Sequence, residues 1–171
     1  MSSIAAALGL HGAGPLGPST SVPNYGPAYL IFNFLLAYGG LAPRHLKQYY
    51  GIDHNVSPRE DLTKYGERAV RDGKLTQRQL NMIKRNESAQ ANTVENFTLF
   101  VAGVTFATFA GVPTQTINTA CLTYTVARIA YGAFYILVET PKLSLLRSVA
   151  SWVGNVSGLT LLWKAGNKLS V

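Results

Sequence analysis

Most of the charged residues are concentrated in about one quarter of this chain of 171 residues. The segment from Arg44 to Glu87 holds ten of the fifteen Lys and Arg residues and six of the eight Asp and Glu residues. Charged residues make up only 13% of the whole chain, against about 25% in typical soluble domains. A soluble fold needs charge over most of its surface, so this distribution predicts an integral membrane protein with one polar loop outside the bilayer.

Four apolar stretches flank or follow this polar segment. Each is long enough to cross a hydrocarbon layer of about 30 Å, which takes about 20 helical residues. The breaks between the last three stretches are short and contain proline, which favours antiparallel neighbours. We therefore expect an all-α fold, an integral membrane four-helix bundle. The expected spans are residues 27–49, 92–111, 114–138 and 143–164.

The polar segments suggest how the chain is divided. Residues 1–27 are rich in Gly, Ala, Pro and Ser and contain no Lys or Arg, so we expect an irregular leader that is neither a secretory signal nor a transit peptide. Residues 28–171 form the expected membrane domain, with a cytosolic loop at about 51–85. In that loop Ser57 is an expected helix N-cap, and a second short helix is expected to begin near Thr76. Pro43 is expected to kink the first span.

The basic residues also indicate orientation and exclude some functions. The positive-inside rule places the 44–87 loop and the loop that holds Lys142 in the cytosol, with both termini on the other side. The net charge of +7 comes from basic residues interleaved with acids and accompanied by few aromatics, which argues against nucleic-acid binding. The single cysteine, Cys121, allows no intrachain disulfide, and the three histidines form no metal-ligand cluster, so no metal site is predicted.

Two polar motifs lie inside apolar stretches. The polar run that begins at Asn86 continues into the second span and brings Asn92 and Glu95 onto one helical face. The third span carries Arg128, Tyr131 and Tyr135 on one face. An arginine at mid-membrane costs roughly 2.5–3.5 kcal/mol, so we expect Glu95 and Arg128 to pair. Such a pair helps to build a buried site or only sets helix packing.

These motifs resemble a known family. The run from Ala89 to Phe100 resembles the second-helix signature of the MAPEG family, the membrane-associated proteins of eicosanoid and glutathione metabolism. The third-span pattern from Arg128 to Tyr135 is similar to that family's Arg-x-x-Tyr-x-x-x-Tyr, and span count and loop lengths match over roughly residues 28–165. The resemblance implies a homotrimer, expected in the endoplasmic reticulum, that binds glutathione between neighbouring subunits near the cytosolic surface.

The resemblance also implies which residues form the site. Family members usually carry an arginine where this chain has Ser88, and Arg85 lies nearly on the same face as a substitute. Arg44, after the first span, is a candidate ligand or only an interfacial anchor. The implied glutathione-binding residues are Arg44, Arg85, Gln90, Asn92, Glu95, Arg128 and Tyr131.

The implied catalytic group is a cation at the start of the fourth helix. A spacing of fourteen residues from Arg128 leads to Lys142, whereas the Leu-Arg-Ser context favours Arg147. Arginine is the better thiolate partner because its charge is permanent and its donors form a fixed fork. Tyr131 or Tyr135 is expected to orient the sulfur by hydrogen bonding. A stripe of small and weakly polar residues on this span indicates close helix packing, in preference to a substrate contact; it consists of Ser144, Ser148, Ser151, Asn155 and Gly158.

The function that the resemblance implies is a membrane-bound glutathione S-transferase or glutathione peroxidase. It acts on a lipophilic electrophile through an arginine-stabilised thiolate, with membrane lipid and a lipophilic small molecule as partners. The alternative is a non-catalytic lipid-binding scaffold or an assembly subunit of the same fold. Ser88 and the open choice between Lys142 and Arg147 favour the alternative.

Overall fold

The computed structural model describes residue 4, residues 8–10 and residues 22–170. Within these residues all regular secondary structure is helical, as the sequence predicts. The elements are α2 (Gly26–Leu35), η1 (Leu36–Gly40), α3 (Arg44–Tyr49), η2 (Pro58–Glu60), η3 (Asp61–Tyr65), α4 (Gly66–Arg71), α5 (Gln77–Phe109), α6 (Thr114–Leu137) and α7 (Pro141–Leu169).

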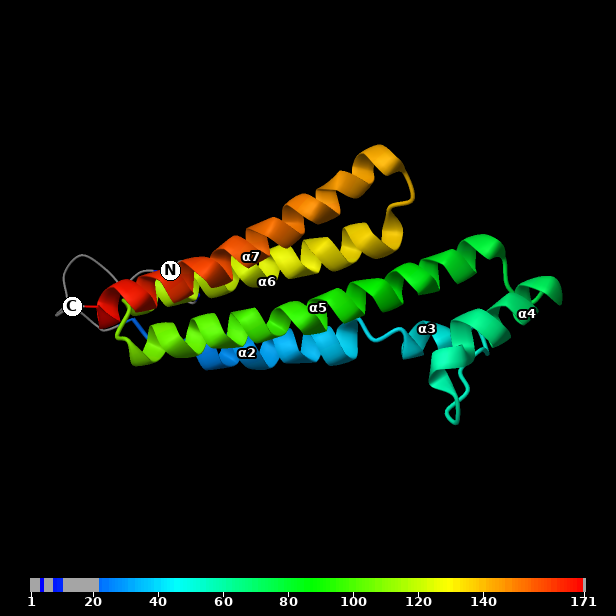
Figure 1. The fold of residues 1–171 in the computed structure, drawn as a ribbon, viewed down its shortest axis with the longest axis horizontal. Helices are drawn as coiled ribbons and strands as arrows, with labels where there is room; N and C mark the ends of the chain where they lie inside the picture. The colour runs from blue at the N-terminus through cyan, green and yellow to red at the C-terminus, as the bar shows by residue number, and fades with distance from the viewer. Residues whose placement is uncertain (1–3, 5–7, 11–21, 171) are drawn as a thin grey trace.

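The long helices lie side by side along the longest axis of the molecule (Figure 1). α6 contacts both α5 and α7, and α2 packs against α5 and α6. The short helices α3 and α4 lie at one end, and the turn between α6 and α7 lies toward the same end (Figure 1). The polar 44–76 segment and the beginning of α7 therefore share one end of the molecule. We call this the charged end.

The first helical segment is shorter than the sequence predicts. α2 continues through the π-helical turn η1 and ends at Gly40, and the chain becomes helical again only at Arg44. The predicted continuous span over 27–49, kinked at Pro43, is therefore wrong. Gly39 and Gly40 favour the coil state, and the proline disfavours a helical conformation at the residue before it, so the helix ends instead of bending.

α5 is a single helix of 33 residues. It begins at the capping box of Thr76, whose hydroxyl accepts the backbone N–H of Gln79 while the Gln79 side chain accepts the backbone N–H of Thr76. The predicted start near Thr76 is confirmed. The prediction of a short helix separate from the span is wrong, because no glycine or proline interrupts the chain between Gln77 and Ala102.

The last two helices follow the predicted boundaries closely. α6 begins directly after Pro113 and ends one residue before the predicted limit, whereas α7 extends beyond its predicted limits at both ends. The turn between α5 and α6 contains Gly111 at φ 70°, a conformation that glycine adopts without strain. Ser57 precedes η2 at the N-cap position, but its side chain makes no capping bond.

One described helix, α6, is long and apolar enough to cross a membrane by length and composition. α2 has only ten residues, and the first half of α5 is polar. The leader lies mostly outside the described residues, so the expected irregular structure of residues 1–27 is described only in part. Its residues Gly9 and Pro23 accept hydrogen bonds from the fully buried side chain of Asn118 on α6.

The interior between the long helices is aromatic and closely packed. The rings of Phe100 on α5 and Tyr124 on α6 stack with centroids 3.8 Å apart. Gly103 lies so close to α7 that a Cβ atom there would meet the carbonyl oxygen of Gly158 at 2.8 Å. The predicted close helix packing through Gly158 is thus confirmed. A second apolar cluster at the charged end packs η3 and α4 against the beginning of α5 through Leu62, Ala69, Leu80 and their neighbours.

Candidate functional site

A small polar pocket lies between α5, α6 and α7, on the half of these helices nearer the charged end. Its volume is about 210 Å³. Tyr131 and Tyr135 are four residues apart on α6, and Arg147 and Ser151 are four residues apart on α7, so each pair shares a helix face. The lining residues are Asn92, Tyr131, Tyr135, Arg147, Ser148, Ser151 and Trp152.

Arg147 is held at the pocket wall by an aromatic ring. Its guanidinium carbon lies 4.6 Å from the centroid of the Tyr135 ring. The ring of Tyr131 meets that of Tyr135 edge-on, with centroids 5.4 Å apart. The negative face of an aromatic ring attracts a cation, and this attraction leaves the planar N–H donors of the guanidinium available.

The charge of Arg147 is uncompensated within the part of the chain that the structure describes. No described carboxylate lies within ion-pair distance of its guanidinium. Among the described residues that line the pocket there is no carboxylate, whereas two phenols, two serine hydroxyls and one amide line it. This is a donor-rich cavity, and it suits an anion that accepts several hydrogen bonds.

Arg128 lies behind the pocket wall and is completely buried. Its Nη1 donates to Oδ1 of Asn92 at 3.3 Å, and its Nη2 donates to Oδ1 of Asn155 at 3.1 Å. The guanidinium carbon lies 5.3 Å from the ring centroids of both Tyr124 and Tyr131. Arg128 therefore joins α5, α6 and α7 through neutral partners, and it does not line the pocket.

The predicted pairing of Glu95 with Arg128 is wrong. Glu95 is exposed on α5 and takes part in no ion pair among the described residues. The amide oxygens of Asn92 and Asn155 satisfy the guanidinium instead, so a carboxylate is not required beside it. A neutral acceptor also avoids the desolvation cost of burying a second charge.

An apolar groove of about 830 Å³ runs along α6 and α7 beside the polar pocket. Its α7 wall extends from Ser148 to Thr160, which corresponds to about 18 Å of helix. Threonine hydroxyls in the groove donate to backbone carbonyls of their own helices, for example Thr123 to Thr119 and Thr160 to Val156. Ser148 and Trp152 line both cavities, so the groove and the polar pocket adjoin.

A model of the MAPEG family matches residues 25–167. The chain belongs to the MAPEG family. The resemblance found in the sequence is therefore confirmed, and with it membership of a membrane-bound family whose members commonly use glutathione. Searches of curated proteins and of solved structures found no match.

The MAPEG second-helix motif is divided between different surfaces of the chain. Asn92 lines the polar pocket, whereas Glu95 and Gln90 do not. Gln90 donates to the carbonyl oxygen of Ala37 at 3.4 Å and lines a second polar pocket of about 300 Å³ at the charged end. On a single chain, the predicted MAPEG ligand residues thus face at least two separate sites.

The second pocket also contains Arg44. Its side chain is half exposed, donates to Oδ1 of Asn55 and pairs with Asp53 at 3.4 Å. Lys47 beneath it is buried and pairs with Asp61, which is fully buried, and with Glu87. Positive and negative side chains alternate around this pocket, in contrast to the donor-rich pocket around Arg147.

Arg85, the expected substitute for the arginine of the MAPEG motif, is used within the chain. Its Nε and Nη2 donate to the carbonyl oxygen of Ile136 near the end of α6, and Nη2 pairs with Glu139 at 3.0 Å. Arg78 pairs with the same carboxylate. The hydrogen bond from Arg85 lowers the pKa of Glu139 below its ordinary value, with further contributions from Arg78. No motif or spacing in the sequence singled out Glu139.

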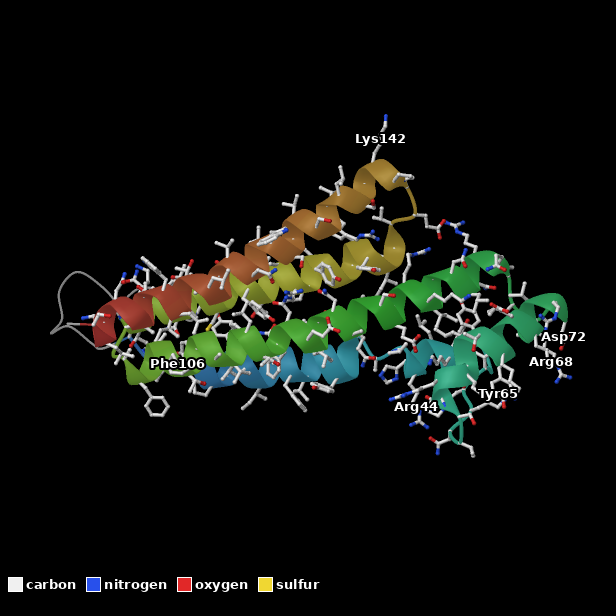
Figure 2. All side chains as sticks on the ribbon, in the orientation of Figure 1. Arg44, Tyr65, Arg68, Asp72, Phe106 and Lys142 are labelled. Carbon is white, nitrogen blue, oxygen red and sulfur yellow. The ribbon has the colours of Figure 1, made fainter. Side chains whose placement is uncertain are left out.

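The structure separates the two candidate catalytic cations. Arg147 lines the polar pocket, and Lys142 is exposed in the first turn of α7. Figure 2 shows the Lys142 side chain directed away from the other helices. Among the expected site residues, the polar pocket brings together Asn92, Tyr131, Tyr135 and Arg147.

Two further pocket residues were partly anticipated by sequence reasoning, and one was missed. Ser148 and Ser151 belonged to the stripe that predicted helix packing, and Trp152 carried no motif. Ser148 and Trp152 lie one and five residues after Arg147 and so on other parts of the helix surface, whereas Ser151, four residues after it, shares its helical face. That spacing was the available signal once Arg147 was chosen.

Proposed function

We propose that this chain is a membrane-bound glutathione-dependent transferase or peroxidase that acts on a lipophilic electrophile. The observation that carries the proposal is the pocket in which Arg147 and Tyr135 face Asn92 and Tyr131. Its donors fit the groups of glutathione that accept hydrogen bonds, namely its carboxylates, its amide carbonyls and an ionised sulfur. Membership of the MAPEG family supports the same assignment.

Arg147 is the proposed thiolate partner. Glutathione supplies a thiol, and only the thiolate form attacks electrophiles efficiently; an ordinary thiol with a pKa near 8.5 is a few per cent ionised at pH 7. A cation about 4 Å from an anion stabilises it by on the order of 4 kcal/mol at an effective dielectric of about 20. That corresponds to up to about three pKa units before desolvation of the anion is subtracted. Tyr135 holds the cation, and Tyr131 and Tyr135 offer phenolic donors to the sulfur.

The apolar groove supports a lipophilic second substrate. Its volume of about 830 Å³ lies within the range of about 300–1,000 Å³ that ligand sites usually occupy. It adjoins the pocket at Ser148 and Trp152, so an apolar chain in the groove would present its reactive end to the arginine. Phospholipid tails and lipophilic electrophiles reach such a groove from the bilayer.

A second subunit is proposed to complete the glutathione site. The polar pocket of one chain is only about 210 Å³, and Arg44, Gln90 and Glu95 face elsewhere. A homotrimer that joins the Arg44 surface of one subunit to the Arg147 surface of the next would bring both sets together. We propose this assembly as four spans per subunit in the endoplasmic reticulum membrane, with the charged end in the cytosol as the positive-inside rule predicts.

A second candidate is the non-catalytic lipid-binding scaffold or assembly subunit. The observation that favours it is the difference in size between the two cavities: the apolar groove is about four times larger than the polar pocket. A chain that only presented lipid would need the groove and not the guanidinium. The two candidates differ in whether glutathione binds and ionises.

The deciding experiment measures glutathione binding and ionisation in detergent-purified protein. We expect glutathione to bind and an ultraviolet thiolate absorbance to develop on binding. Arg147→Ala should abolish that absorbance, whereas the matched variant Lys142→Ala, on the same helix but outside the pocket, should retain it. Absence of binding at millimolar glutathione would reject the enzyme and leave the scaffold. Loss of the thiolate signal in Lys142→Ala instead would reassign the cation.

A further inference from the structure

Asn92 lines the polar pocket, and its side-chain amide is contacted by Arg128, which lies outside the pocket. This contact determines whether the amide presents a donor or an acceptor to the pocket. Arginine has donors only, so the group that Arg128 contacts must be the amide oxygen of Asn92. The Nδ2 amino group of Asn92 donates to no acceptor among the described residues. It is also not among the buried polar atoms that lack a hydrogen-bond partner, so it is accessible. It is therefore the part of Asn92 that remains available to the pocket.

Arg128 is in turn held by contacts with side chains of α5, α6 and α7. Its second arm donates to Asn155, and the rings of Tyr124 and Tyr131 lie at equal distances from its guanidinium. On α7, Gly154 provides the space: a Cβ atom there would lie 3.3 Å from Nε of Arg128. Within the described part of the chain, that Nε has no hydrogen-bond partner, so the two terminal bonds carry all of the polar contacts of the group.

We propose that Arg128 and Asn155 are positioning residues that fix the orientation of the Asn92 amide, so that the pocket presents an NH2 donor and selects a ligand acceptor. This inference rests on the proposed function, in which that acceptor is a carboxylate or carbonyl oxygen of glutathione. It reassigns Arg128, which the sequence placed among the ligand-binding residues. Arg128 acts through Asn92 and Tyr131 and does not touch the ligand.

The decisive variant is Asn92→Asp. The substitution is isosteric, and an aspartate at this position still accepts from Arg128, now as an ion pair, so the fold keeps its contact. The pocket, however, loses its amide donor and gains an acceptor that repels carboxylates. We expect the Kd for glutathione to rise by at least about tenfold, the order of a lost charged hydrogen bond, without a fall in the thermal unfolding temperature.

Variants of Arg128 and Asn155, which lie outside the pocket, also test the orientation of the Asn92 amide. Asn155→Ala removes one arm of the guanidinium contact, and Arg128→Lys keeps the charge but cannot bond both asparagines in the same way. We expect each to weaken glutathione binding several-fold while the thiolate absorbance of the bound fraction is retained, because Arg147 is unchanged. Asn96→Ala, one turn along α5 and outside the pocket, is the matched control and should bind glutathione as the wild type does.

The readouts separate this inference from the proposed function. Absence of glutathione binding to the wild type would reject the proposed function itself. Binding by the wild type together with unchanged Kd in Asn92→Asp and Asn155→Ala would overturn the inference alone. So would a loss of unfolding temperature in Asn155→Ala and Arg128→Lys with no change in Kd, because that pattern belongs to a residue that only holds helices together.

Discussion

At the scale of single residues, the contact between Arg147 and Tyr135 is the part of the pocket most directly open to test. A cation–π contact contributes about 0.5–2 kcal/mol, according to how far it is desolvated. Replacing Tyr135 by Phe keeps the ring and removes the hydroxyl, and replacing it by Leu removes the ring as well. The pair of variants therefore separates the two roles of this side chain.

We predict that Tyr135→Leu lowers kcat/KM for glutathione conjugation or peroxide reduction by roughly 2- to 30-fold, because Arg147 loses the ring that holds it. Tyr135→Phe should retain the position of the guanidinium and lose only the phenolic hydrogen bond. Steady-state kinetics on both variants measures this. Equal losses in the two variants would show that the hydroxyl, and not the ring, is the part that matters.

At the scale of helices, the close approach of α5 and α7 at Gly103 sets the distance between these two helices. We predict that Gly103→Ala destabilises the protein by about 1–3 kcal/mol, because the added methyl group would have to displace the backbone of α7 at Gly158. Gly166→Ala is the matched control on α7: no atom of the described residues lies within 4 Å of its Cβ position, so the same substitution should stabilise by about 0.5–1 kcal/mol. Denaturation in detergent measures both. A neutral Gly103→Ala would mean that α5 and α7 separate easily.

The Glu139 contacts tie the α6–α7 turn to α5, and they predict a pH dependence. The folded state holds the pKa of Glu139 below its unfolded value of about 4.3, so its contribution to stability is present above that value and is lost as pH falls through the folded pKa. The difference in unfolding temperature between wild type and Glu139→Gln should therefore shrink as pH falls from about 5 to about 3. Parallel curves over this range would contradict the prediction.

The sequence predicted the helices correctly where a local signal, such as a proline or a capping box, marks a helix end. The boundaries of α6 and the beginning of α5 were predictable because proline and a Thr–Gln capping box mark them. The continuity of α5 was missed because polarity changes within it, although nothing in the chain breaks the helix. The partners of Arg128 were not predicted either, because charge alone pointed to Glu95. Asn92 is a neutral residue on the same helical face as Glu95, and Asn155 belongs to a pattern that indicates packing.

At the scale of the whole molecule, the site residues fall on two surfaces of one chain, which predicts complementation between subunits. Arg44→Ala and Arg147→Ala are expected to be nearly inactive alone. In the proposed trimers, assembled from an equal mixture, about a quarter of the interfaces would join an intact Arg44 surface to an intact Arg147 surface, so about a quarter of wild-type activity should return. Activity assays after co-expression measure this. No recovery in mixed trimers would mean that one chain holds the complete site.

The uninterrupted course of α5 limits how the charged end can vary. Its 33 residues span about 50 Å, with the α4 contacts of Leu80 near one end and Asn92 about 18 Å further along. Each residue inserted between them would rotate the two parts by about 100° relative to each other and advance one by about 1.5 Å. Insertions or deletions in this part of α5 should therefore be tolerated only near multiples of a full turn. The helix sets both the distance and the rotation between the α4 contacts and the pocket.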